Sequence, residues 1–218
     1  MVENSSSQVN PIEYLWLGLY SFAGFSIELL LGIIIGLLNN VAISRSSNLL
    51  LVGFLWFGFA TLLHQYSKRK FNFDVFQFNE QLTISRFLSI IVIVIIIIAI
   101  NSLGFGGFKP FVEFNNGSQG DVLTYLSQVF YYLGESSLIV LTIAFGQQFF
   151  EKQFSLTINF PSGGIFLALT WGALHILLQG VNGGMYAMLF SVLSGMIYLL
   201  CKKDFKYSYL FVALAFIL

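Results

Sequence analysis

Seven apolar stretches divide the chain and constrain its fold more than any other feature of the sequence. They cover residues 14–38, 48–66, 86–103, 126–150, 164–180, 183–201 and 206–218. A helix needs about 20 apolar residues to cross about 30 Å of hydrocarbon, and most of these stretches are close to that length. We therefore predict an all-α, polytopic transmembrane helical bundle with about seven spans.

The composition agrees with a membrane protein. Only 9% of the 218 residues are charged, which is too few to cover the surface of a soluble domain of this size. Ten acidic and ten basic side chains cancel, so nothing indicates nucleic-acid binding. The first stretch is longer than a signal-peptide core and no Lys or Arg precedes it, so we expect an anchored helix. One cysteine, Cys201, excludes an intrachain disulfide and a thiolate cluster.

The basic residues are distributed unequally between the two ends of the predicted spans. With seven spans, the loops on one side of the membrane hold only Arg45 and Lys109. The loops on the side of the N-terminus hold the other eight, which are Lys68, Arg69, Lys70, Arg86, Lys152, Lys202, Lys203 and Lys206. Because cytoplasmic loops are enriched in Lys and Arg, we predict a multi-pass protein of the cell membrane with a cytoplasmic N-terminus and an external C-terminus.

The spans suggest three parts. Residues 1–13 are expected to form a cytoplasmic tail, and residues 14–125 the N-terminal helices with an interfacial loop. This loop, residues 104–125, mixes Phe, Gly and Pro, as suits a segment at the membrane interface. Residues 126–218 would form a core of four helices.

Charged groups inside a membrane cost on the order of 2.5–3.5 kcal/mol, so each needs a partner or a function. His64 directly precedes a basic segment, and we expect it at the interface. Glu28 belongs to the series Gly24, Glu28, Gly32 and Gly36, whose spacing of four places all of them on one helix face. Small residues at this spacing allow another helix to approach closely. We favour a structural, hydrogen-bonded carboxyl at Glu28 over a direct part in chemistry.

Two further helices have polar faces. Glu135 shares a face with Tyr131 and Thr142 on the stretch 126–150. Trp171, His175 and Gln179 recur at i, i+4 and i+8 on the next stretch.

The ionisable residues of these faces lie at one depth. A rise of about 1.5 Å per residue puts Glu28, Glu135 and His175 in the outer half of the membrane. We predict that Glu135 and His175 face each other within direct or one-water hydrogen-bonding reach, with Glu28 as an optional third member. A structural polar cluster without chemistry would produce the same pattern.

Residues 126–218 resemble the CAAX-protease and bacteriocin-processing (CPBP, or Abi) family of intramembrane proteins. Glu135 stands where that family has Glu-Glu-x-x-x-Arg, and Trp171-x-x-x-His175 stands where it has Phe-x-x-x-His. A Gly-rich hairpin at 179–184 and a stripe of Ala187, Ser191 and Gly195 follow in the expected order. The resemblance implies a membrane-embedded site in which Glu and His side chains activate water to cleave prenylated or peptide substrates.

Several family positions differ in this chain. Ser136 replaces the second acid, Ile139 and Val140 occupy the places where Arg would fall, and no His follows His175. We therefore expect a non-catalytic or degenerate relative that acts in binding, regulation or immunity through a polar intramembrane cavity. This cavity would be lined by Glu28, Tyr131, Thr142, Trp171 and Gln179.

Two other functions remain open. An active intramembrane CAAX-type endopeptidase would use Glu135 as general base and His175 as its partner or as a metal ligand. A divalent metal such as zinc normally takes three protein ligands in catalytic sites, so Glu28 would have to be the third. A component of a small-solute transporter is the second alternative. The expected partners are the lipid bilayer and a membrane peptide or membrane protein.

Overall fold

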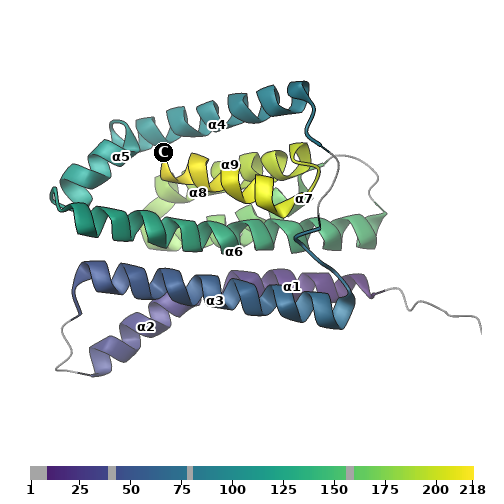
Figure 1. Cartoon of the computed structure of the whole chain (residues 1–218), viewed down its shortest axis with the longest axis horizontal. Helices are drawn as coiled ribbons and strands as arrows, with labels where there is room; N and C mark the ends of the chain where they lie inside the picture. Colours follow the sequence, from purple (N-terminus) through teal and green to yellow (C-terminus); the bar gives the residue numbers. More distant parts are fainter. Residues whose placement is uncertain (1–8, 39–42, 78–80, 156–159) are drawn as a thin grey trace, which may run out of the picture.

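The computed structural model describes residues 9–38, 43–77, 81–155 and 160–218, and these form an all-α bundle (Figure 1). Its longer helices and their bounds are α1 (Pro11–Ala23), α2 (Ser26–Leu37), α3 (Arg45–Phe71), α4 (Ile84–Phe105), α6 (Val122–Phe154), α8 (Ala173–Leu200) and α9 (Phe205–Ile217). Its shorter elements are α5 (Lys109–Val112), α7 (Ser162–Leu167) and two π-helical turns, Glu113–Gly117 and Ala168–Gly172. All seven predicted stretches are mostly helical in the described residues, and the first is divided into α1 and α2.

Five helical segments of the described chain are long and apolar enough to cross a membrane, as predicted for a membrane protein. They are Pro11–Leu37, Arg45–Phe71, Ile84–Gly117, Val122–Phe154 and Ser162–Leu200. The last of them contains two predicted spans, which explains part of the difference from seven. The other difference is α9, whose 13 residues measure about 20 Å and fall short of the hydrocarbon thickness.

Polar side chains fix where several helices begin. A helix leaves its first N–H groups unpaired, and Ser, Thr, Asp and Asn at the preceding position accept hydrogen bonds from them. Caps of this kind precede five helices, at Asn10, Ser44, Thr83, Asp121 and Asp204. The apolar runs of the sequence are therefore bounded by capping residues that define the ends of the helices.

The segment Ser162–Leu200 folds into a helical hairpin at Gly180. Gly180 has φ 78° and ψ 178°, a conformation that is essentially restricted to glycine. The two arms pack so closely that a Cβ on Gly195 would lie 2.5 Å from the Cα of Gly164. The predicted hairpin at 179–184 is thus present, and the predicted stripe of Ala187, Ser191 and Gly195 contributes to a close helix contact.

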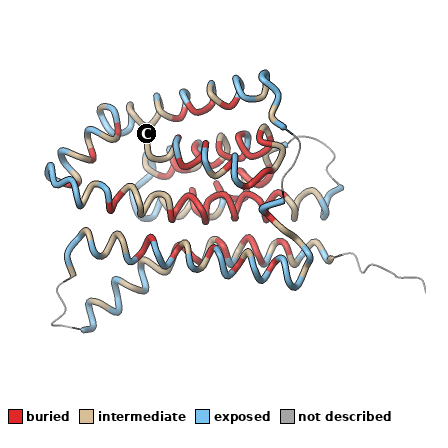
Figure 2. The backbone as a smooth tube through the Cα atoms, in the orientation of Figure 1, coloured by how far each residue is buried: buried red, intermediate tan, exposed pale blue. Residues whose placement is uncertain are grey.

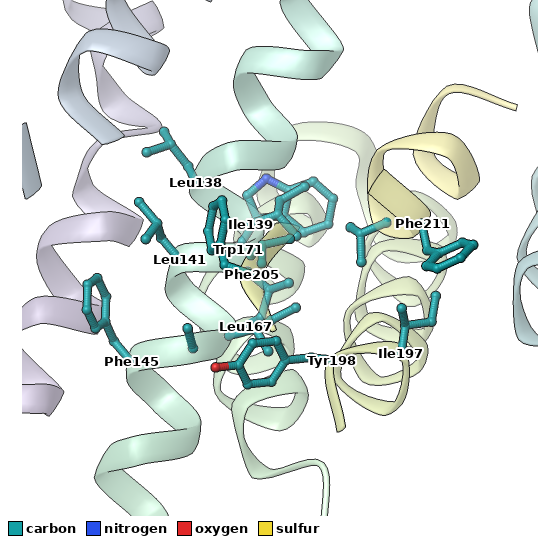
Figure 3. Packing of buried hydrophobic residues seen from close by; sticks show 14 of the residues in the cluster. Leu138, Ile139, Leu141, Phe145, Leu167, Trp171, Ile197, Tyr198, Phe205 and Phe211 are labelled. Carbon is teal, nitrogen blue, oxygen red and sulfur yellow. The ribbon is translucent and has the colours of Figure 1, made fainter. Parts of the chain in front are cut away.

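Helix α6 lies at the centre of the bundle (Figure 1). It packs against α1 and α3 on one side and against α7 and α9 on the other, with α4 outside α8 and α9. It is buried over most of its length, whereas a smaller share of each of the other long segments is buried (Figure 2). The core around α6 includes Leu138, Ile139 and Phe145 of that helix, with Trp171 and Phe205 from the C-terminal half (Figure 3).

Two expectations about packing need correction. A Cβ on Gly24 would collide with the Phe59 ring, but Gly32 and Gly36 face open space. Helix α2 turns away from α1 and has no buried residue, so none of the described helices packs against Gly32 and Gly36 (Figure 2). The predicted loop 104–125 also contains helical turns, because Pro110 at the first turn of α5 suits a helix start.

Candidate functional site

A cavity of about 360 Å³ lies among α6, the hairpin arms and the ends of α3, α4 and α9. We call it the charged cavity, because Glu28, Arg45, Lys109 and Glu135 all line it. A second cavity of about 320 Å³, the side cavity, adjoins it between α2 and the first hairpin arm. Six residues line both cavities and form a partition between them, namely Glu28, Tyr131, Glu135, Trp171, His175 and Gln179. This set contains every predicted site residue except Thr142.

Trp171 connects the two predicted catalytic residues. Its indole Nε1–H donates a hydrogen bond to Glu135 Oε1 at 3.2 Å. Its carbonyl oxygen lies 2.7 Å from His175 Nδ1, and its ring stands 4.2 Å from the imidazole, centroid to centroid. Glu135 and His175 therefore share one neighbourhood, and their described hydrogen bonds both lead to Trp171.

The local fold explains this arrangement. The π-helical turn Ala168–Gly172 interrupts the first hairpin arm at Trp171, and such turns are frequent at functional sites. The centroids of the Phe25 and Phe190 rings lie 6.2 and 6.0 Å from that of the indole. Glu135 is 7% exposed, and a buried carboxyl needs such a donor to offset the loss of water.

Glu28 occupies the opposite edge of the partition. The Tyr131 hydroxyl donates a hydrogen bond to Glu28 Oε2 at 2.8 Å, which joins α2 to α6. The sequence favoured a structural carboxyl at Glu28 that is hydrogen-bonded across a helix contact. In the structure Glu28 does accept a hydrogen bond, but its partner is Tyr131 on α6 and not a helix packed along the glycine stripe.

Thr142 does not line either cavity. Its hydroxyl lies 2.8 Å from Leu138 O and 2.9 Å from Ser21 Oγ, so it belongs to the contact between α6 and α1. The residue shares the face of Glu135, as the spacing predicted, but it lies two turns further along α6, where α1 covers that face. The helical period indicates a face but not how far along the helix a cavity extends.

Several polar residues of the charged cavity were not predicted from the sequence, among them Arg45, Lys109 and Gln128. Arg45 and Lys109 were assigned to loops, and Gln128 was not noticed. Lys109 is 3% exposed, donates a hydrogen bond to the carbonyl of Phe216 and lies 4.4 Å from the centroid of the Tyr132 ring. The sequence does contain a signal that groups Arg45 with Lys109, because the prediction of seven spans places only these two basic residues on the same side of the membrane.

A hydrogen-bonded chain supports this part of the cavity. Gln128 Nε2 donates to the Tyr132 hydroxyl at 2.8 Å, and that hydroxyl donates to the buried carboxylate of Glu113. Arg45 Nη1 donates to the carbonyl of Gly117 in the π-helical turn. The short helices after α4 thus bring charged groups over the end of the bundle.

A catalytic zinc site does not fit the residues that the structure describes. Over these residues, no group of three His, Cys, Asp or Glu side chains is placed to hold a metal ion. Glu135 and His175 each contact Trp171, and Glu28 is bonded to Tyr131.

Comparison with known proteins yields no relative. No family model, no curated protein and no solved structure matches the chain. The resemblance to the CPBP family therefore rests on the sequence motifs alone.

Proposed function

We propose that this protein is a CPBP-like integral membrane protein that has lost catalysis and acts by binding a membrane-embedded partner in its cavities. The observation that supports this proposal is the position of Trp171 between Glu135 and His175. A general base must be within hydrogen-bond reach of the water that it activates. Here the acid and the imidazole are both engaged by one buried tryptophan, as in a structural polar cluster.

The cavities support the binding part of the proposal. Ligand sites are concave, largely apolar and supplied with a few polar groups that fix orientation. The side cavity has this character, and the partition places carboxyl, phenol, indole, imidazole and amide groups between it and the charged cavity. We propose a peptide or lipid of the membrane as the class of ligand.

The distribution of basic residues supports an orientation. Figure 1 shows the starts of α1, α4 and α9 at the same end of the bundle as the ends of α3 and α6. The eight basic residues grouped by the sequence analysis belong to this end, where Lys203 Nζ also pairs with Glu151 Oε2 at 2.6 Å. We propose that this end faces the cytoplasm and that the charged cavity lies toward the external side.

The test separates binding from catalysis. Purified protein would be incubated with membrane peptides and prenylated peptides, with and without a chelator, and both cleavage and retention of each peptide would be measured. We expect no cleavage above that of a His175→Ala control, and we expect Glu135→Gln to retain the bound peptides because the amide keeps an acceptor for Trp171.

An active endopeptidase would give the opposite result. Cleavage would then be reproducible, and Glu135→Gln would lower its rate about 10²–10⁴-fold by removing the base. Such cleavage, abolished in both Glu135→Gln and His175→Ala, would refute the non-catalytic proposal.

A further inference from the structure

The charged cavity holds two cations, Arg45 and Lys109, that form no ion pair within 4 Å among the described residues. Lys109 Nζ is bonded to a carbonyl and lies over aromatic rings, and Arg45 Nη1 is bonded to the Gly117 carbonyl. The ion pairs among the described residues involve other cations. Lys109 is 3% exposed, and a buried cation without a close opposite charge is costly, so an anionic ligand beside it would lower the free energy of the bound state.

An unpaired acceptor lies beside the two cations. Gln128 Oε1 is buried and has no hydrogen-bond partner, although Gln128 Nε2 is bonded to Tyr132. Native structures rarely leave such a group unsatisfied, and each case needs an explanation. A ligand with both a negative charge and a hydroxyl donor would satisfy Gln128, Arg45 and Lys109 together.

The side cavity is suited to the apolar part of the same ligand. Beyond the shared partition, its lining is mostly apolar and includes Phe22, Phe25, Leu29, Trp56, Leu174 and Leu178. Leu29 and Leu178 are more than half exposed on the surface of the bundle, where lipid would surround them. An acyl chain thus has a route from the bilayer to the partition.

We propose that the two cavities bind one anionic phospholipid, with its phosphate at Arg45 and Lys109, a headgroup hydroxyl at Gln128 and an acyl chain in the side cavity. Guanidinium groups suit phosphate because they present paired N–H donors, and a lysine adds a point charge. The negative phosphate suits the part of the charged cavity that holds these two cations, and the apolar lining of the side cavity suits the acyl chain. This inference rests on the proposed function and names the ligand of its cavities.

Lipid retention by the purified protein tests the headgroup. Native mass spectrometry of protein in detergent would compare phosphatidylglycerol with phosphatidylcholine of the same acyl chains. We expect preferential retention of phosphatidylglycerol, which Arg45→Gln and Lys109→Gln each weaken about fivefold, the effect of roughly one basic side chain near an anionic lipid. Arg86→Gln removes the same charge at the opposite end and should leave retention unchanged. Equal retention in the Arg45, Lys109 and Arg86 variants would overturn the proposal.

Controls separate binding from folding. Arg45→Lys keeps the charge and should retain most of the preference, and size-exclusion chromatography would show whether each variant is folded. Free glycerol phosphate carries the headgroup chemistry without a chain. If it competes as strongly as the phospholipid, the site is one for soluble phosphate and the lipid assignment is wrong.

Fluorescence quenching tests the acyl chain. Trp56 and Trp171 line the side cavity and are only 1% and 4% exposed, so surrounding lipid does not reach them, whereas Trp16 is half exposed. In a Trp16→Phe protein, phosphatidylglycerol with brominated chains should quench the two remaining tryptophans, and Arg45→Gln should reduce the quenching. Absence of quenching would refute the proposed position of the chain.

The outcomes are distinct from those of the proposed function. Loss of lipid preference would leave peptide retention and the absence of cleavage as they are. Cleavage of peptides would refute the proposed function while the lipid result still held.

Discussion

Replacement of Gly195 by alanine tests the close contact between the hairpin arms. A Cβ at this position would lie 2.5 Å from the Cα and 2.7 Å from the N of Gly164. Carbon atoms pack favourably at about 3.5–4.0 Å, so the arms would have to separate by roughly 1 Å. The opposing atoms are backbone atoms of a glycine, and no side chain can rotate away to relieve the overlap.

Gly32→Ala is the matched control. A Cβ on Gly32 meets nothing within 4 Å, and both substitutions replace a helical glycine by alanine. They gain the same helix propensity, at most about 1 kcal/mol, so their difference isolates the packing. Overpacking typically costs about 1–3 kcal/mol, and we expect Gly195→Ala to be less stable than Gly32→Ala by this amount.

Unfolding of both variants by sodium dodecyl sulfate in mixed micelles, followed by circular dichroism, would measure the difference. A loss of this size is a large part of the 5–15 kcal/mol that typically stabilises a protein. Equal unfolding midpoints for Gly195→Ala and Gly32→Ala would show that the arms do not touch as described.

Three further predictions concern other parts of the chain. Burial raises the pKa of the Cys201 thiol to about 12, so maleimide at pH 8 should label it only after denaturation, and rapid labelling of the native protein would contradict its position. The Lys68 ammonium, hydrogen-bonded at 2.7 Å, lowers the pKa of Asp74, so this pair stabilises the fold above the usual aspartate pKa of about 3.9 and loses the effect as the pH falls through the lower folded value. Asp74→Asn should remove that pH dependence. Because the pair is exposed, we expect its contribution to the free energy of unfolding to be less than about 1 kcal/mol, and chemical unfolding at pH 3 and pH 6 would measure it. In a Cys201→Ser background, impermeant maleimide applied outside intact cells should label Asn116→Cys and not Gln77→Cys, and the reverse pattern would invert the proposed orientation.

The helices and the hairpin were predictable because each has a local cause. Apolar length defines the helices, and Gly180 provides the reversal between two runs of the right length. The stripe of Ala187, Ser191 and Gly195 likewise predicted a close contact. The stripe of Gly32 and Gly36 has the same spacing but faces open space, because α2 diverges from the bundle after Gly24. Spacing alone does not specify which partner is present.

The candidate site was predictable only in part. Polar faces and equal depth predicted that Glu28, Glu135 and His175 gather, and these residues line the same two cavities. The direct or one-water approach of Glu135 to His175 stays a prediction, and the described bonds show Trp171 between them. The cationic end was missed because Lys109 enters the cavity from short helices within a segment expected to be a loop.

The hydrogen bond between Trp171 and Glu135 has an evolutionary consequence. A phenylalanine at position 171 would have no N–H to donate, whereas Trp171 provides one to a carboxyl that is almost fully buried. Trp171→Phe alone would leave Glu135 without that donor, and an apolar residue at 135 alone would leave the indole N–H unpaired. The two positions are therefore epistatic, and a lineage can exchange either residue at low cost only after, or together with, the other.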